Sequence, residues 1–161
     1  MSAAGAPCFH CGEPIPRGLD LHARIAGRDE PVCCHGCKAV AEFITGAGLG
    51  DYYRYRDTSS TRADEPPRPD RWAAYDRPEL VERLTRAEPN GARSITVLLE
   101  GLRCAACSWL ADKALSLQSG VLDVSVNPAT ARARLVWAPQ KVRLGHLLRV
   151  LEHVGLRPHP L

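Results

Sequence analysis

Residues 101–110 read GLRCAACSWL, and this stretch decides how the second half of the chain folds. Cys104 and Cys107 stand between an alternating apolar run and a run of good helix formers. The preceding run, RSITVLLEG, alternates in polarity and predicts a strand. The buried face of that strand is expected to carry Ile95, Val97 and Leu99. The cysteine pair is therefore predicted to lie in a strand-to-helix turn.

The segments that follow the pair continue this pattern. CSWLADKALSLQ predicts a helix, and VLDVSVN predicts a strand with Leu122, Val124 and Val126 facing inward. The turn NPAT joins that strand to ARARLVW, so the two runs form a hairpin. VRLGHLLRVLEHVG carries leucines at helical spacing and precedes a short extended tail. This order of elements predicts a ferredoxin-like βαββαβ arrangement for residues 92–161.

The position of Cys104 and Cys107 favours a particular ligand chemistry. Unpaired N–H groups and the positive end of the helix dipole favour thiolates at a helix start. Two soft thiolates on an exposed loop, with no His or carboxylate beside them, suit Cu(I). A structural zinc site needs four closed ligands, and two fall short. A pair of core cysteines and a thioredoxin-like dithiol remain as alternatives.

The same residues carry a family resemblance. GLRCAACSWL, the strand order around it and HVGLRP near the end resemble the heavy-metal-associated domain of copper chaperones and copper-transporting P-type ATPases. The resemblance implies that Cys104 and Cys107 bind Cu(I) in near-linear geometry. Leu102 replaces the Met of the family pattern Gly-Met-x-Cys-x-x-Cys. Leu156 stands where the family often has an aromatic residue.

A second cysteine cluster lies near the start of the chain. CFHCGEPIP and VCCHGCKAVAEFI give the pairs Cys8–Cys11 and Cys34–Cys37, the layout of a zinc ribbon or treble clef. A piece of about 50 residues struggles to fold on core burial alone. A tetrathiolate zinc site supplies about 10–16 kcal/mol of apparent binding energy at neutral pH. We therefore expect these four cysteines to hold Zn(II) or copper, with Cys33 as a spare thiol, an alternative ligand or a copper-transfer thiol.

The surroundings of this cluster give two further expectations. The helix begun by GCKAVAEFI is expected to pack Val40, Phe43 and Ile44 against the metal-held hairpin. His10 and His35 are expected to face solvent rather than to act as ligands.

The cluster also resembles a known domain. Its Cys-x-x-Cys-Gly, the later Cys-Cys-x-Gly-Cys and GLGDYYRYR at 48–56 resemble the metal-binding domain at the N-terminus of a subset of heavy-metal P-type ATPases. The two resemblances together cover nearly the whole chain. In that order they imply the branch of copper ATPases that supplies haem–copper oxidase assembly.

Charge and cysteine usage narrow the class of protein. The net charge is only +3, and the basic residues are mostly scattered arginines, so no nucleic-acid partner is expected. The start of the chain lacks the features of a signal peptide, and no apolar run reaches the roughly 18 residues of a membrane span. We therefore expect a soluble, cytosolic chain. In a reducing cytosol, seven cysteines indicate metal or redox chemistry rather than disulfides.

The sequence thus predicts an α+β protein in three parts. These are a Cys-rich treble-clef or zinc-ribbon-like domain at 1–56, a linker with a short helix at 57–91, and the ferredoxin-like domain at 92–161. The resemblance implies the N-terminal piece of a longer copper-exporting ATPase on the cytoplasmic side of a bacterial inner membrane. Its expected partners are a cytosolic copper chaperone and the membrane and ATP-hydrolysing domains of the same pump.

Three alternatives remain at this point. One is a free-standing copper chaperone or buffer, and another is a dithiol oxidoreductase that uses Cys104 and Cys107. The last is a zinc-dependent adaptor that rests only on the first cluster. The chain has no Asp-Lys-Thr-Gly motif and no Cys-Pro-Cys, so ATP hydrolysis by this chain alone is not expected.

Overall fold

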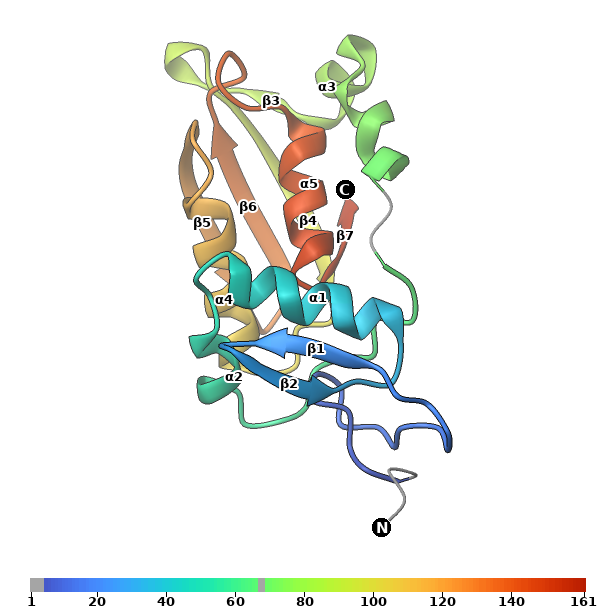
Figure 1. Ribbon diagram of the computed structural model, residues 1–161. Helices are drawn as coiled ribbons and strands as arrows, with labels where there is room; N and C mark the ends of the chain where they lie inside the picture. The colour runs from blue at the N-terminus through green and yellow to red at the C-terminus, as the bar shows by residue number, and fades with distance from the viewer. Residues whose placement is uncertain (1–4, 67–68) are drawn as a thin grey trace.

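The computed structural model describes residues 5–66 and 69–161. A Cys-rich segment (residues 5–66) lies against a ferredoxin-like unit (residues 92–161), as Figure 1 shows. The helices and strands of the Cys-rich segment are β1 (His22–Ile25), β2 (Arg28–Pro31), α1 (His35–Gly46) and α2 (Asp51–Tyr55). β1 and β2 form an antiparallel hairpin. Its turn places Ala26 and Gly27 at φ 50° and 82°, the left-handed region that a two-residue hairpin requires.

The ferredoxin-like unit follows the predicted order of elements. These are β4 (Arg93–Glu100), α4 (Ala105–Ser116), β5 (Val121–Asn127), β6 (Arg132–Trp137), α5 (Leu144–His153) and β7 (Arg157–Pro160). The antiparallel sheet runs β4-β6-β5, and β7 pairs with the other edge of β4. The predicted α+β fold with a ferredoxin-like unit is confirmed. Among the described residues, no helix combines the length and the apolar character of a membrane span.

The predicted core faces are found with one exception, in β5. Ile95, Val97 and Leu99 are buried, but Leu122 is 61% exposed, so the prediction that it faces inward is wrong. The cause is a β-bulge between Val121 and Asp123, which inserts one extra residue opposite β6. Because side chains alternate along a strand, one extra residue moves Leu122 to the solvent face.

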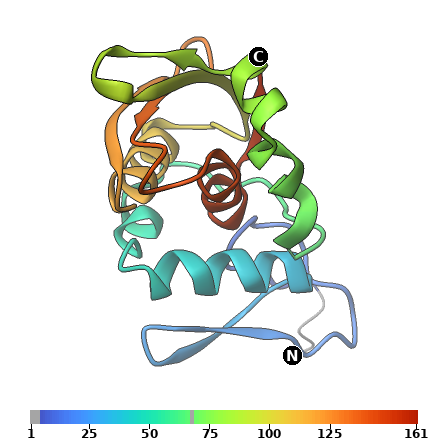
Figure 2. The same cartoon turned by 90° about the horizontal axis from the view of Figure 1, so that it is seen from above.

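Helix α1 is apolar on two faces. In Figure 2 it lies between the β1–β2 hairpin and α5. Its Ala41 packs with the hairpin, whereas Val40 and Ile44 belong to the core of the ferredoxin-like unit. Phe43 stacks on His153 of α5 at 4.8 Å between ring centroids. The prediction that Val40, Phe43 and Ile44 pack against the hairpin is therefore wrong, and the two parts of the chain share one core.

Residues 69–91 also pack onto the ferredoxin-like unit. Their elements are η1 (Pro69–Asp76), α3 (Pro78–Leu84), β3 (Arg86–Ala87) and η2 (Pro89–Gly91). The buried Trp72 donates its indole N–H to Glu152 of α5 over 3.1 Å. The backbone N–H of Gly145 donates to the Asp76 carboxylate over 2.8 Å. These bonds hold η1 on α5, and β3 adds a short strand beside β4.

The contact between η1 and α5 generates a stability prediction. A Cβ at Gly145 would lie 2.7 Å from both the Trp72 carbonyl oxygen and the Asp76 carboxylate. We expect Gly145→Ala to lower the free energy of unfolding by about 1–3 kcal/mol, because the backbone of η1 must shift. Urea unfolding measures this value. The control is Gly46→Ala, since no atom lies within 4 Å of a Cβ there. Equal stability of the two variants would contradict the packing described.

Candidate metal centres

The first cysteine turn is built by local backbone bonds. Gly12 N–H donates to the Cys8 carbonyl and Cys8 N–H to the Glu13 carbonyl, each over 2.9 Å. Gly12 has φ +76°, the left-handed conformation that glycine adopts without strain. The turn therefore closes behind Cys8 and Cys11, which are both buried.

The second cysteine turn leads into α1. Cys34 is the N-cap of that helix, with an extended backbone at φ −162°, and its sulfur accepts the Cys37 N–H over 3.4 Å. Although burial acts to raise the pKa of Cys34, this hydrogen bond and those from its neighbours lower it. The Cys34 sulfur is thus held by a hydrogen bond at the N-terminus of α1.

Four sulfur atoms from the two turns come together. Those of Cys8, Cys11, Cys33 and Cys37 all lie within 4.8 Å of one another. The Cys11–Cys33 and Cys33–Cys37 sulfur distances are 3.6 and 3.8 Å. A tetrahedral metal with bonds of about 2.3 Å to sulfur requires sulfur atoms about 3.8 Å apart. All four residues are free cysteines, and this set of soft donors fits a tetrahedral metal ion.

The electrostatics of the group also favour a cation. A hydrogen bond from the Cys37 thiol, with further backbone bonds, lowers the pKa of Cys8 to about 4. The same bond raises the pKa of Cys37, and burial raises those of Cys11 and Cys33. The shared hydrogen bond and the burial of these thiols therefore oppose ionisation of all four together. A bound cation removes this restriction because it deprotonates the thiols that coordinate it.

This grouping differs from the predicted ligand set at one residue. The sequence predicts Cys34 with Cys8, Cys11 and Cys37, and leaves Cys33 as a spare thiol, an alternative ligand or a copper-transfer thiol. The structure places Cys33 among the four grouped sulfur atoms and Cys34 outside them. Spacing alone favours Cys34, because it completes a Cys-x-x-Cys pair. The missed signal is that Cys34 stands at the N-cap, where a side chain turns toward the free N–H groups of the helix.

His10 is buried, so the prediction that it faces solvent is wrong. It is 2% exposed, and its Nδ1 lies 2.8 Å from the Tyr53 hydroxyl. Burial, followed by the charge of Arg56, lowers the pKa of His10 to about 4. A neutral histidine therefore fills this position inside the first cysteine turn, while His35 is exposed as predicted.

The guanidinium of Arg56 organises the first cysteine turn from outside. It donates to the carbonyl oxygens of Phe9 and His10 over 2.6 and 2.5 Å, and to the Ser60 hydroxyl over 2.8 Å. It also lies over the Tyr53 ring, 4.7 Å from the centroid. These contacts fix the turn between Cys8 and Cys11, since both carbonyl groups belong to it.

The second candidate centre is the pair Cys104 and Cys107. Cys104 is the N-cap of α4 with φ −156°, and its sulfur makes no capping hydrogen bond. Cys107 lies in the first helical turn, where its N–H donates to the Cys104 carbonyl over 3.0 Å. Both thiols are free. Cys104 is half-buried and Cys107 is 3% exposed, so only one of the pair lies on the exposed loop that the sequence predicts.

Helix α2 of the Cys-rich segment covers Cys107. The Tyr52 hydroxyl lies 3.7 Å from the Cys107 sulfur and 2.5 Å from the Ser60 hydroxyl. Burial raises the pKa of Tyr52 above its usual range, which keeps this phenol protonated. Tyr55 packs edge-on against Trp109 with ring centroids 5.6 Å apart. Side chains of the Cys-rich segment therefore form part of the surroundings of the Cys104–Cys107 pair.

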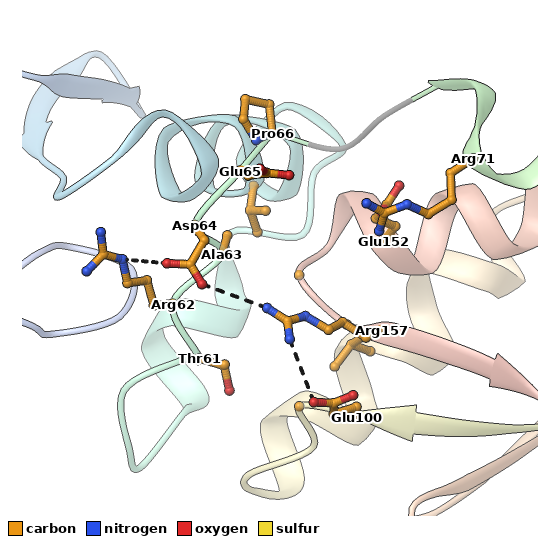
Figure 3. Close-up of a pocket in the computed structure, with 14 residues that line it drawn as sticks. Thr61, Arg62, Ala63, Asp64, Glu65, Pro66, Arg71, Glu100, Glu152 and Arg157 are labelled. Atoms are coloured by element: carbon orange, nitrogen blue, oxygen red, sulfur yellow. Dashed lines mark hydrogen bonds and ion pairs between the residues drawn. The ribbon is translucent and has the colours of Figure 1, made fainter.

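A charged cavity of about 480 Å³ marks another part of the contact between the Cys-rich segment and the ferredoxin-like unit. Its ion pairs alternate in sign from Arg62 to Asp64, then to Arg157 and Glu100, as Figure 3 shows. Arg62 and Asp64 belong to the Cys-rich segment, and Glu100 and Arg157 to β4 and β7. Because these side chains are largely exposed, the pairs add specificity to the contact more than stability.

Comparisons with solved structures return single domains that align with less than half of this chain. A copper-binding domain from HMA7, a P-type ATPase, is 32% identical over 42% of this chain and 92% of that chain, with a TM-score of 0.41. The N-terminal domain of PacS from Synechocystis PCC6803 is 29% identical over 42% of this chain and 96% of that chain, with a TM-score of 0.37. Oxidized MerP from Ralstonia metallidurans CH34 is 25% identical over 43% and 96%, with a TM-score of 0.42. No curated protein matches the chain.

Two family models match along the chain. Residues 96–155 match the heavy-metal-associated domain. Residues 7–88, half of the chain, match the metal-binding domain of cation transport ATPases and extend past the boundary at 56 that the sequence predicts. The cysteine groups described above lie in these two regions. The chain therefore belongs to the family of metal-binding domains of cation transport ATPases, with a heavy-metal-associated domain following the first one.

Proposed function

We propose that this chain is the cytosolic metal-binding region of a Cu(I)-exporting P-type ATPase, and that it takes up Cu(I) at Cys104 and Cys107. The observation that carries the proposal is the pair of free thiols at the start of α4, inside a heavy-metal-associated domain. Two soft sulfur donors at a helix N-terminus suit Cu(I), a soft monovalent ion. An incomplete set of ligands also allows the ion to be passed on.

The four-sulfur group has a separate role in this proposal. Cys8, Cys11, Cys33 and Cys37 would hold one Zn(II), which supplies a fixed tetrahedral crosslink between the two cysteine turns. The apolar cluster around them is small, and these four cysteines make up four of its nine buried residues. Metal binding there is therefore a source of folding energy for the Cys-rich segment.

Copper enters by exchange of sulfur ligands. A donor chaperone presents Cu(I) on two thiolates, and Cys104 attacks first because it is the more accessible thiol of the pair. Its sulfur bonds to copper, its proton passes to a departing donor thiolate, and one donor bond breaks. Cys107 repeats the exchange and completes the transfer. Copper stays Cu(I) throughout, and no free ion is released.

The family supports a wider setting for this proposal. The partners proposed are a cytosolic copper chaperone and the membrane and ATP-hydrolysing domains of the same pump, at the cytoplasmic face of a bacterial inner membrane. The pump would belong to the branch that supplies haem–copper oxidase assembly. A free-standing copper chaperone or buffer would use the same site. A dithiol oxidoreductase would instead require Cys104 and Cys107 to cycle through a disulfide.

The copper proposal is tested by anaerobic titration of Cu(I) against a competing chelator. We expect one tightly bound Cu(I) in the parent chain and none at that affinity in the Cys104→Ser/Cys107→Ser variant, because serine oxygen is a poor ligand for Cu(I). We expect Cys104→Ser alone to impair transfer from a dithiolate donor at least as severely as Cys107→Ser does. An unchanged copper stoichiometry in the double variant would refute the assignment.

The zinc proposal is tested at the two adjacent cysteines. Cys33→Ser is expected to lose bound zinc, since it removes one of the four grouped sulfur atoms. Cys34→Ser is the matched control, because serine is a good N-cap and the four sulfur atoms stay intact. Zinc content of the purified proteins, by elemental analysis, distinguishes the two variants. Zinc retained by Cys33→Ser and lost from Cys34→Ser would reverse the assignment.

A further inference from the structure

The Cys107 sulfur has a neighbour from outside its own domain. Tyr52, Ser60 and Cys107 are 3%, 5% and 3% exposed, so their contact is shielded from water. Tyr52 and Ser60 belong to the Cys-rich segment, and Cys107 to the ferredoxin-like unit. This contact joins the second candidate metal centre to the segment that carries the first.

The hydrogen bonds of this group can all run in one direction, from Arg56 toward the Cys107 sulfur. Arg56 is a pure donor, and it donates to the Ser60 hydroxyl over 2.8 Å. The Ser60 hydroxyl can donate a hydrogen bond to the Tyr52 oxygen, and the Tyr52 hydroxyl can donate one to the Cys107 sulfur. A thiolate sulfur only accepts, so this direction is required once Cys107 has lost its proton. In such a series of hydrogen bonds, the positive charge of Arg56 polarises each following O–H group toward the sulfur.

This series of hydrogen bonds favours the thiolate form of Cys107, which is the form that binds Cu(I). Two thiolates and one Cu(I) carry a net charge of −1, whereas two protonated thiols without the metal carry no charge. Hydrogen bonds to charged groups are roughly twice as strong as neutral ones. The Tyr52 hydroxyl therefore stabilises the copper-bound pair more than the free pair.

We propose that Tyr52 is a positioning residue of the Cys104–Cys107 site, and that its hydroxyl strengthens Cu(I) binding there through the Cys107 sulfur. This inference rests on the proposed function of that pair. Residues from both parts of the chain then form the copper site. The Cys-rich segment then acts on copper through Tyr52, while its own cysteines hold zinc.

The test compares three Tyr→Phe variants of the whole chain in anaerobic competition for Cu(I) with bathocuproine disulfonate. Tyr52→Phe keeps the buried ring and removes the hydroxyl, and we expect Cu(I) affinity to fall by about tenfold. Tyr55→Phe is the control and is expected to keep the parent affinity, whereas Tyr53→Phe measures the effect of losing a hydroxyl beside the first cysteine turn. Tyr55 is 60% exposed on the same helix, and the Tyr53 hydroxyl contacts His10 instead of Cys107.

A spectroscopic readout separates positioning from general stability. The buried Tyr52 hydroxyl proton, followed by NMR, is expected to shift when one equivalent of Cu(I) is added, while the Tyr53 hydroxyl proton stays in place. Parent-like affinity in Tyr52→Phe, with tight Cu(I) binding by the parent chain, would overturn this inference alone. Cu(I) binding that survives loss of both Cys104 and Cys107 would overturn the proposed function, and this inference with it.

Discussion

The hydrogen bonds donated by the guanidinium of Arg56 are the interactions on which the arrangement of both candidate metal centres depends. It donates to two carbonyl groups inside the Cys8–Cys11 turn and to Ser60, whose hydroxyl contacts Tyr52 and through it Cys107. The Arg56 cation therefore supports both the shape of the first cysteine turn and the position of Tyr52 over Cys107. A lysine could not reproduce this role, because a planar fork of donors is needed to reach three oxygen atoms at once.

Apolar packing makes the same connection on a larger scale. Val40, Ile44, Leu49 and Tyr52 of the Cys-rich segment belong to the core that contains the sheet and helices of the ferredoxin-like unit. The cluster left around the cysteines contains few large side chains. A metal ion would therefore organise the side of α1 that faces the hairpin, while packing against α5 organises the other. Burial on both sides explains why α1 is apolar on two faces.

Much of the fold could be predicted from the sequence, and the failures have physical causes. Alternation placed Ile95, Val97 and Leu99 inward, but it cannot detect the bulge that turns Leu122 outward. Local patterns also do not show which neighbour a helix packs against, so the sequence predicts the wrong packing surface for Val40 and Ile44. The Cys104–Cys107 turn was predictable because the strand, turn and helix are contiguous. The roles of His10 and Tyr52 depend on residues more than 40 positions away, which local sequence patterns do not show.

The central claim is that the metal-held cysteine turns support the cover over Cys107. Hydrogen–deuterium exchange of the peptide spanning residues 104–110 tests it most directly, in copper-free protein with and without zinc in the first cluster. The account predicts that zinc removal speeds exchange in this peptide, because Arg56, Ser60 and Tyr52 lose their fixed positions, while β6 keeps its protection. Equal exchange in the two forms would show that the cover does not depend on the first metal centre and would contradict the account.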